Sequence, residues 1–121
     1  MATPNLINVD TITPVCQIQA VTTSRASIVD VNAEYCAKVN SLIIANIDGT
    51  NAADITVEIS IDNGSNYFAI AKTISVPADS SLSIIGKDNG FYLDETDLLA
   101  VTASANSDLT AMVSYELMKD A

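Results

Sequence analysis

The sequence contains no histidine and no tryptophan, and its aromatic residues are four tyrosines and two phenylalanines. Without histidine, the usual Ser-His-Asp and Cys-His catalytic pairs cannot form. A pair of carboxylates, as in glycosidases, remains the formal alternative. The few aromatic side chains also argue against a stacking platform for bases or sugars. We therefore expect a protein that is not an enzyme.

Basic residues are scarce, with 5 lysines and arginines against 15 acids and a formal net charge of -10. Nucleic-acid binding depends largely on neutralising phosphates, so we expect neither a nucleic-acid partner nor an anionic membrane partner. No window approaches the roughly 18 consecutive apolar residues of a membrane span. The first ten residues, MATPNLINVD, lack the basic and apolar segments of a signal peptide, which predicts a protein made and kept in a cytosol unless it leaves as part of a larger particle.

Only two cysteines are present, Cys16 and Cys36, and their spacing of about twenty residues matches no metal or redox motif. Two interpretations remain open. Both thiols can be small buried apolar groups, as in reducing compartments, or they can form one disulfide that ties the N-terminal segment to a later strand. We expect no cofactor.

The acidic run Asp94, Glu95 and Asp97 is typical of a solvated turn between strands. Carboxylate oxygens are also the ligands that calcium prefers, so these three residues are weak candidates for a metal site. The spacing does not match an EF-hand loop, and we expect no metal.

The stretch Leu42–Ile61 predicts two strands joined by a polar turn. Ile43, Ala45 and Ile47 alternate with other residues in the first half, and Ile55, Val57, Ile59 and Ile61 alternate in the second. A period of two is the signal of a strand with one face in the core, so we expect Val57 to be buried. The pair is either a hairpin or two strands that cross between sheets.

The rest of the chain shows about seven or eight strands at spacings near ten residues, without a convincing helical period. Asn63-Gly64 is a strong hairpin signal, and Lys72 interrupts an apolar face, which indicates a bulge or an edge strand. The pattern predicts a single antiparallel β-sandwich over residues 15–121, of jelly-roll or Ig-like type, with a barrel as the alternative. Many outward positions are polar, so we expect no large apolar patch.

Residues 1–14 contain two of the three prolines and few apolar residues, which predicts an extended arm. Leu6, Ile7 and Val9 are the candidate partner-binding residues, because an extended arm can add a strand to a neighbour or fill a groove. The alternative is a terminus without a role, since chain ends are often frayed.

Several segments, taken in order, resemble small virion proteins of tailed bacteriophages. The segments that carry the resemblance are Ser41–Gly49, Ile55–Val57, Ile74–Leu82, Tyr92–Asp97 and Val113–Glu116. The resemblance implies a structural β-domain on a head, neck or tail, without enzymatic activity.

From this resemblance we expect a capsid decoration or cement protein on the outer surface of a phage head. Its implied partners are the major capsid protein or other virion proteins and further copies of itself, and its implied location is the virion. The alternatives are a neck, tail or fibre component and, from another class, a carbohydrate-binding sandwich module.

Overall fold

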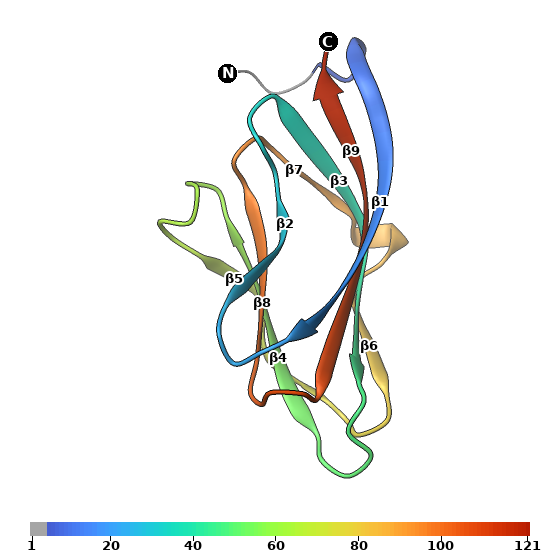
Figure 1. The fold of residues 1–121 in the computed structure, drawn as a ribbon, viewed down its shortest axis with the longest axis vertical. Helices are drawn as coiled ribbons and strands as arrows, with labels where there is room; N and C mark the ends of the chain where they lie inside the picture. The colour runs from blue at the N-terminus through green and yellow to red at the C-terminus, as the bar shows by residue number, and fades with distance from the viewer. Residues whose placement is uncertain (1–4) are drawn as a thin grey trace.

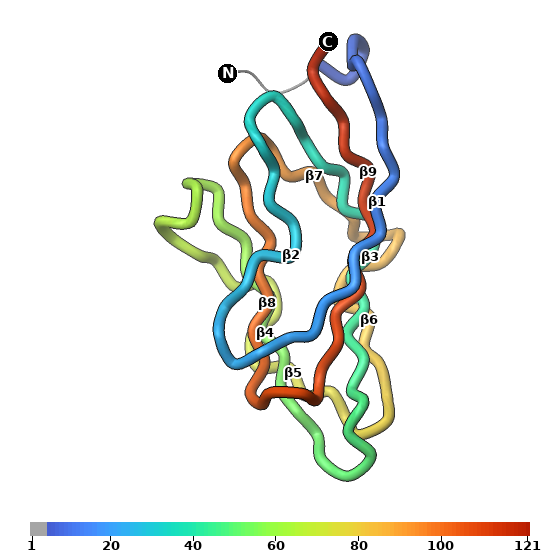
Figure 2. The backbone as a smooth tube through the Cα atoms, in the orientation of Figure 1, coloured from blue at the N-terminus to red at the C-terminus, as the bar shows by residue number. Residues whose placement is uncertain are grey.

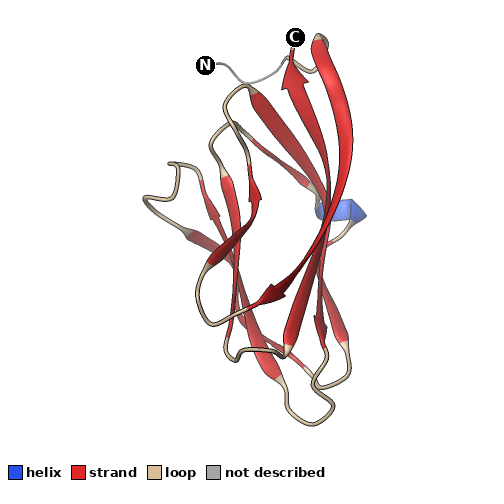
Figure 3. Ribbon diagram, in the orientation of Figure 1, coloured by secondary structure: helices blue, strands red, loops and turns tan. Residues whose placement is uncertain are grey.

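The computed structural model describes residues 5–121, which form nine strands and one short 3-10 helix (Figures 1 and 3). No helix in this part of the chain is long and apolar enough to cross a membrane. The elements are β1 (Val9–Val21), β2 (Ala26–Asp30), β3 (Tyr35–Asn46), β4 (Ala53–Ser60), β5 (Phe68–Val76), β6 (Ser81–Ile85), η1 (Lys87–Asn89), β7 (Phe91–Leu93), β8 (Leu98–Ala103) and β9 (Leu109–Asp120).

The strands form two antiparallel sheets that pack face to face, which confirms the predicted all-β sandwich (Figure 1). One sheet has the order β1-β9-β3-β6, with β7 also paired to β3, and the other has the order β2-β8-β4-β5. Consecutive strands from β1 to β6 lie in alternate sheets, except that β4 and β5 are neighbours in one of them. This order is that of a jelly roll, so the connectivity decides between the two sandwich types that the sequence left open.

The predicted pair of strands in Leu42–Ile61 exists, but its members lie in different sheets. Strand β3 belongs to the first sheet and β4 to the second, so the chain crosses between sheets instead of forming a hairpin. Leu42 and Ile44 of β3 are fully buried, whereas Ile47 is exposed. Both faces of β3 carry apolar residues. The predicted alternation of Ile43 and Ala45 therefore follows the outer face of this strand, and Ile47 comes directly after the strand ends.

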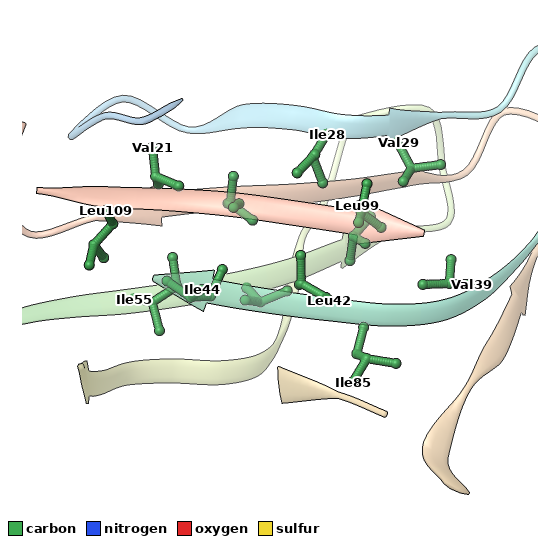
Figure 4. Close-up of a cluster of buried hydrophobic side chains, with 14 of the residues drawn as sticks. Val21, Ile28, Val29, Val39, Leu42, Ile44, Ile55, Ile85, Leu99 and Leu109 are labelled. Carbon is green, nitrogen blue, oxygen red and sulfur yellow. The ribbon is translucent and has the colours of Figure 1, made fainter. Parts of the chain in front are cut away.

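The core consists of aliphatic side chains from both sheets (Figure 4). Val57 and Ile55 of β4 are fully buried, and Ile59 is partly buried, as the alternation predicted. Burying one such side chain stabilises the fold by about 1.5–3 kcal/mol. The largest fully buried side chains are Leu42, Ile44, Ile55, Leu93, Leu99 and Leu109, together with Val21, Val29, Val31, Val39, Val57 and Val76.

Asn46 connects the two places where the chain crosses between sheets at one end of the sandwich. Its side chain is buried, and its Nδ2 donates to the carbonyl oxygens of Asn51 and Val76 at 3.0 and 2.9 Å. Its Oδ1 accepts a hydrogen bond from the Asp48 backbone N–H at 2.9 Å. One amide therefore satisfies three backbone groups that the strands leave unpaired.

Strands β6 and β7 follow one another along the same edge of β3. Strand β6 pairs with Leu42–Ala45 and β7 with Ala37–Val39, while η1 lies between them. Gly90 is required at this junction, because a Cβ atom there would lie 2.7 Å from the Val39 carbonyl oxygen. The short helix thus lets two short strands share one long partner.

The Asn63-Gly64 turn has positive φ angles at both residues, 59° and 89°, as the sequence signal predicted. The Ser60 hydroxyl accepts a bond from the Gly64 N–H and donates to Asp62, and the Asp62 carboxylate accepts two bonds from Asn66. These bonds hold the pKa of Asp62 below its usual range. The segment 61–67 projects from the body of the sandwich (Figure 2).

The predicted boundary of the N-terminal arm is wrong, because the first strand begins at Val9 and not after Pro14. Residues from Val9 onward pair with β9, including Ile12 with Met118 and Pro14 with Glu116. The strand tolerates proline because it lies at the edge of its sheet, where one row of N–H groups has no partner. The described part of the chain before the sandwich is therefore only residues 5–8.

We expect the substitution Val57→Asp to unfold the domain. An unpaired carboxylate at this fully buried position costs several kcal/mol, which approaches the whole stability of a small domain. The matched control is Thr102→Asp on the neighbouring strand, which is partly exposed and should fold. Thermal melting followed by circular dichroism measures both, and equal behaviour of the two variants would contradict the assigned faces.

The substitution Asn46→Ala should lower the free energy of unfolding by about 3 kcal/mol, since each of three lost hydrogen bonds contributes about 1 kcal/mol. Asn51→Ala is the control, because the exposed Asn51 side chain makes one long bond, 3.3 Å, to the Asp48 carboxylate, and its effect should stay within about 0.5 kcal/mol. Urea denaturation gives both values. A small loss for Asn46→Ala would show that water replaces its bonds.

Candidate interaction surface

The acidic run that the sequence offered as a weak metal site is a hydrogen-bonded turn. The Asp97 carboxylate accepts a bond from the Asp94 N–H at 2.8 Å, and the Glu95 carboxylate accepts one from the Glu34 N–H at 2.8 Å. The backbone of Thr96 and Asp97 also bonds to Val31. These contacts fasten the turn at 94–97 to the segment that joins β2 and β3.

This use of the carboxylates leaves a poor donor set for a cation. Asp97 is only 8% exposed, and burial raises its pKa above the usual range. A buried carboxylate without a positive partner is costly to ionise. Between residues 5 and 121, no group of three or more acidic or cysteine side chains is arranged to hold a metal ion.

The two cysteines have different environments and form no bridge with each other. Cys36 is 3% exposed, and its thiol pKa is raised by burial and by the nearby charge of Asp94. Cys16 is exposed on β1. The expectation of buried thiols is correct for Cys36 and wrong for Cys16, and the alternative of an intramolecular disulfide is wrong.

The basic side chains do not gather into one surface. Arg25 forms a two-pronged ion pair with Glu58, with N···O distances of 2.9 and 3.2 Å, and its guanidinium lies 3.9 Å from the centre of the Tyr67 ring. The Lys119 ammonium lies 3.9 Å from an Asp10 oxygen. Such pairs compensate the charge of these basic side chains locally.

Two shallow hollows open on the surface of the described chain. One lies beside the crossovers and is lined by Ala45, Asn46, Ile47, Asp79, Ser80 and Ser81. The other, of about 590 Å³, mixes two lysines with two carboxylates and is lined by Lys38, Asn40, Ser41, Lys87, Asp88, Gly90 and Glu116. Neither hollow is lined by a cysteine, so neither contains a thiol nucleophile beside a base. The second hollow contains both positive and negative side chains.

The exposed aromatic side chains do not form a platform for a sugar. Phe68 and Tyr92 are both more than half exposed, but Phe68 lies on β5 in one sheet and Tyr92 on β7 in the other. Flat aromatic binding surfaces need neighbouring rings on one face. The arrangement gives no specific support to the carbohydrate-binding alternative.

The three predicted partner-binding residues of the N-terminal segment are divided by the start of β1. Leu6 and Ile7 are exposed, and Ile7 at 95% makes almost no contact with its own chain. Val9 is half-buried and pairs with Asp120. Leu6 and Ile7 are therefore available to a neighbour, whereas Val9 belongs to the sheet.

Three large apolar side chains of strand β5 are exposed, and we call this group the β5 row: Phe68, Ile70 and Ile74. Strand β5 lies at the edge of its sheet and shifts register against β4 at two places, and Thr73 has a φ of 48°. The interruption at Lys72 thus correctly predicted both an edge and a bulge. The expectation of polar outer positions did not foresee the exposed β5 row.

Strand β1 has its apolar face turned away from the core. Residues that pair across neighbouring strands share a face, so Gln17, opposite the buried Val113, faces inward with Val15 and Gln19. Cys16, Ile18 and Ala20 face outward and are exposed. This inversion is possible because β1 is an edge strand whose inner face is only partly covered by the other sheet.

One comparison with a solved structure supports the fold. The chain is similar to a solved structure from Bacillus endospore appendages, described as a family of disulfide-linked pili, with a TM-score of 0.55 and 18% identity over 92% of this chain and 88% of that one. A pentameric capsid protein from metagenomic phage sequences matches at a TM-score of 0.38 and 16% identity, over 95% of this chain and 62% of that one. No family model and no curated protein matches the chain.

We expect excess Ca²⁺ or a chelator to leave the melting temperature unchanged. The oxygens of Asp97 and Glu95 already accept backbone hydrogen bonds, so a cation would have to break the turn in order to bind. Differential scanning calorimetry with and without the ion measures the effect. A clear rise with Ca²⁺ that disappears in Asp97→Asn would restore the metal site.

Proposed function

We propose that this chain is a non-enzymatic structural subunit that works in many copies in a virion, and more specifically a decoration protein on the outer surface of a phage capsid. The β5 row is the observation that carries the proposal. Phe68, Ile70 and Ile74 are exposed, and ladder pairing places Phe68 and Ile74 on the same face as Ile59 and Ile55 of β4, at the edge of the sheet. Exposed apolar side chains of this size, gathered on one edge strand, are typical of a surface that a partner covers.

The charge of the chain supports an outward position. With a net charge of -10, the protein would be repelled by packaged DNA on the inner side of a shell. Strand β5 carries one charge, that of Lys72, and of the two acids on the neighbouring strand β4, Asp54 and Glu58, the second is paired with Arg25. An apolar partner surface therefore meets few uncompensated charges there. The partner that fits best is a capsid protein with an apolar patch, and Leu6 and Ile7 provide a second anchor.

A pilus-like appendage is a second candidate, which the similarity in fold to the Bacillus appendage structure favours. A chain of subunits joined by disulfides needs two accessible thiols in each subunit. In this structure Cys16 is exposed and Cys36 is buried, so the folded subunit can form a covalent dimer but not a covalent polymer. Long filaments of the purified chain in electron micrographs would favour this candidate over decoration.

Phe68→Asp should reduce the occupancy of the protein on phage particles on the order of tenfold, because one central aromatic anchor can carry that share of a binding energy. Its side chain is 61% exposed, so the melting temperature should stay within a few degrees. Quantitative mass spectrometry of purified particles measures the occupancy. The matched control is Tyr92→Asp, an aromatic residue with 54% exposure on another strand, which should bind normally.

The same measurement tests the finer proposal through the number of copies. A decoration protein is expected in hundreds of copies on each particle, whereas a neck or tail ring has around a dozen, as closed symmetry implies. Absence of the protein from particles would overturn the proposed function. Hydrolase activity of the purified chain would also overturn it, if replacing one acidic residue by its amide removes that activity.

A further inference from the structure

The second half of strand β1, Val15–Val21, is an edge that the chain does not protect. Edge strands of soluble proteins are usually short, bulged, or supplied with charges that prevent pairing with another chain. Strand β2 has five residues and carries Asp30, and β6 also has five residues. Strand β5 has Lys72 and two shifts of register. Strand β1 has 13 residues, and its first part has Asp10, a shift of register and Pro14, whereas its last seven residues have no charge, proline or shift.

The segment Val15–Val21 of β1 is also regular. It pairs with β9 without any shift from Val15, opposite Tyr115, to Val21, opposite Leu109. Pro14 precedes it, and the turn that leads to β2 follows it. Since proline cannot donate a backbone hydrogen bond, it limits strand addition to the residues after it.

The sequence of this segment, VCQIQAV, reads nearly the same in both directions around Ile18. In an antiparallel pair of two such segments centred on Ile18, Val15 lies opposite Val21, Cys16 opposite Ala20, Gln17 opposite Gln19 and Ile18 opposite Ile18. Each pair joins side chains of the same chemical kind. A contact across a two-fold axis requires this type of self-complementarity, in which residue i meets residue j and j meets i.

We propose that Val15–Val21 pairs with the same segment of a second copy of this chain, about a two-fold axis at Ile18. The two copies then share one continuous sheet, in which β1 of one protomer lies beside β1 of its partner. Exposed Ile18 and Cys16 become covered on the outer face, while the glutamine side chains bond to each other on the inner face. The biological setting of this pairing rests on the proposed function. The pairing adds to that function the contact between copies of the chain.

Electrostatics favours this contact over others between copies. Each protomer carries a net charge of -10, so most of its surface repels a second copy. The segment between Asp10 and Arg25 lets two backbones approach without placing acids against each other. Pairing also uses the unprotected edge in both protomers, so the assembly closes as a dimer and does not extend into a fibre.

Sedimentation velocity of the purified full chain tests the proposal. We expect a dimer, and Ile18→Lys should weaken dimerisation by on the order of tenfold or more, because two ammonium groups then lie opposite each other. Ile47→Lys is the matched control, since Ile47 is 65% exposed and Ile18 66%, and this variant should remain dimeric. A mixture of Ile18→Lys with Ile18→Glu should dimerise again.

A cross-link then tests the register. In a Cys16→Ser background, Ile18→Cys places two thiols directly opposite each other, at a spacing that a disulfide spans, and oxidation should give a covalent dimer. In the unaltered chain the two Cys16 side chains are about 14 Å apart along the strands and should not cross-link within the dimer. Rapid disulfide formation by native Cys16 in the dimer would overturn the Ile18-centred register.

The proposal and the proposed function fail separately. A chain that stays monomeric at about 1 mM, or a dimer that Ile18→Lys does not weaken while the variant remains folded, overturns the pairing whether or not the protein is found on particles. A dimer that responds as expected but is absent from particles supports the pairing and overturns the virion function.

Discussion

The contact between the apolar inner faces of the two sheets is the constraint on which the rest of this structure depends. The chain is small and has no disulfide or large aromatic cluster to stabilise it, so aliphatic residues from both sheets supply the core. Keeping consecutive strands in opposite sheets requires crossovers at the ends of the sandwich. The buried side chain of Asn46 satisfies the backbone groups that two of these crossovers leave unpaired.

The acidic residues also serve the fold in ways that composition does not reveal. Asp62 organises the projecting turn, and Asp97 and Glu95 accept bonds from backbone N–H groups that would otherwise lack partners. A carboxylate that already accepts such bonds has less capacity left for a cation. An acidic cluster in a loop of a β-sandwich is therefore weak support for a metal site until its hydrogen bonds are known.

The surfaces that remain are edges and strand faces, and they differ in how they can bind. The β5 row is irregular and carries a lysine, which suits contact through side chains with a different surface. The β1 edge is regular and uncharged over seven residues, which suits backbone pairing. A structural subunit needs both kinds of contact if it is to meet its own copies and another protein.

The sequence by itself determined the all-β class, almost every strand, the buried face of β4 and the turn at Asn63-Gly64, because alternation and turn chemistry act over a few residues. It also located the bulged edge at Lys72. Only the tertiary structure decided which sheet each strand joins, since pairing β3 with β9 joins residues far apart in the chain. Long-range pairing likewise explains why the fold begins at Val9 and not after Pro14, why Cys16 and Ile18 face outward, and why the Asp97 carboxylate accepts a backbone hydrogen bond. Local patterns show that a strand has two faces, but the neighbour that covers each face is set by long-range packing.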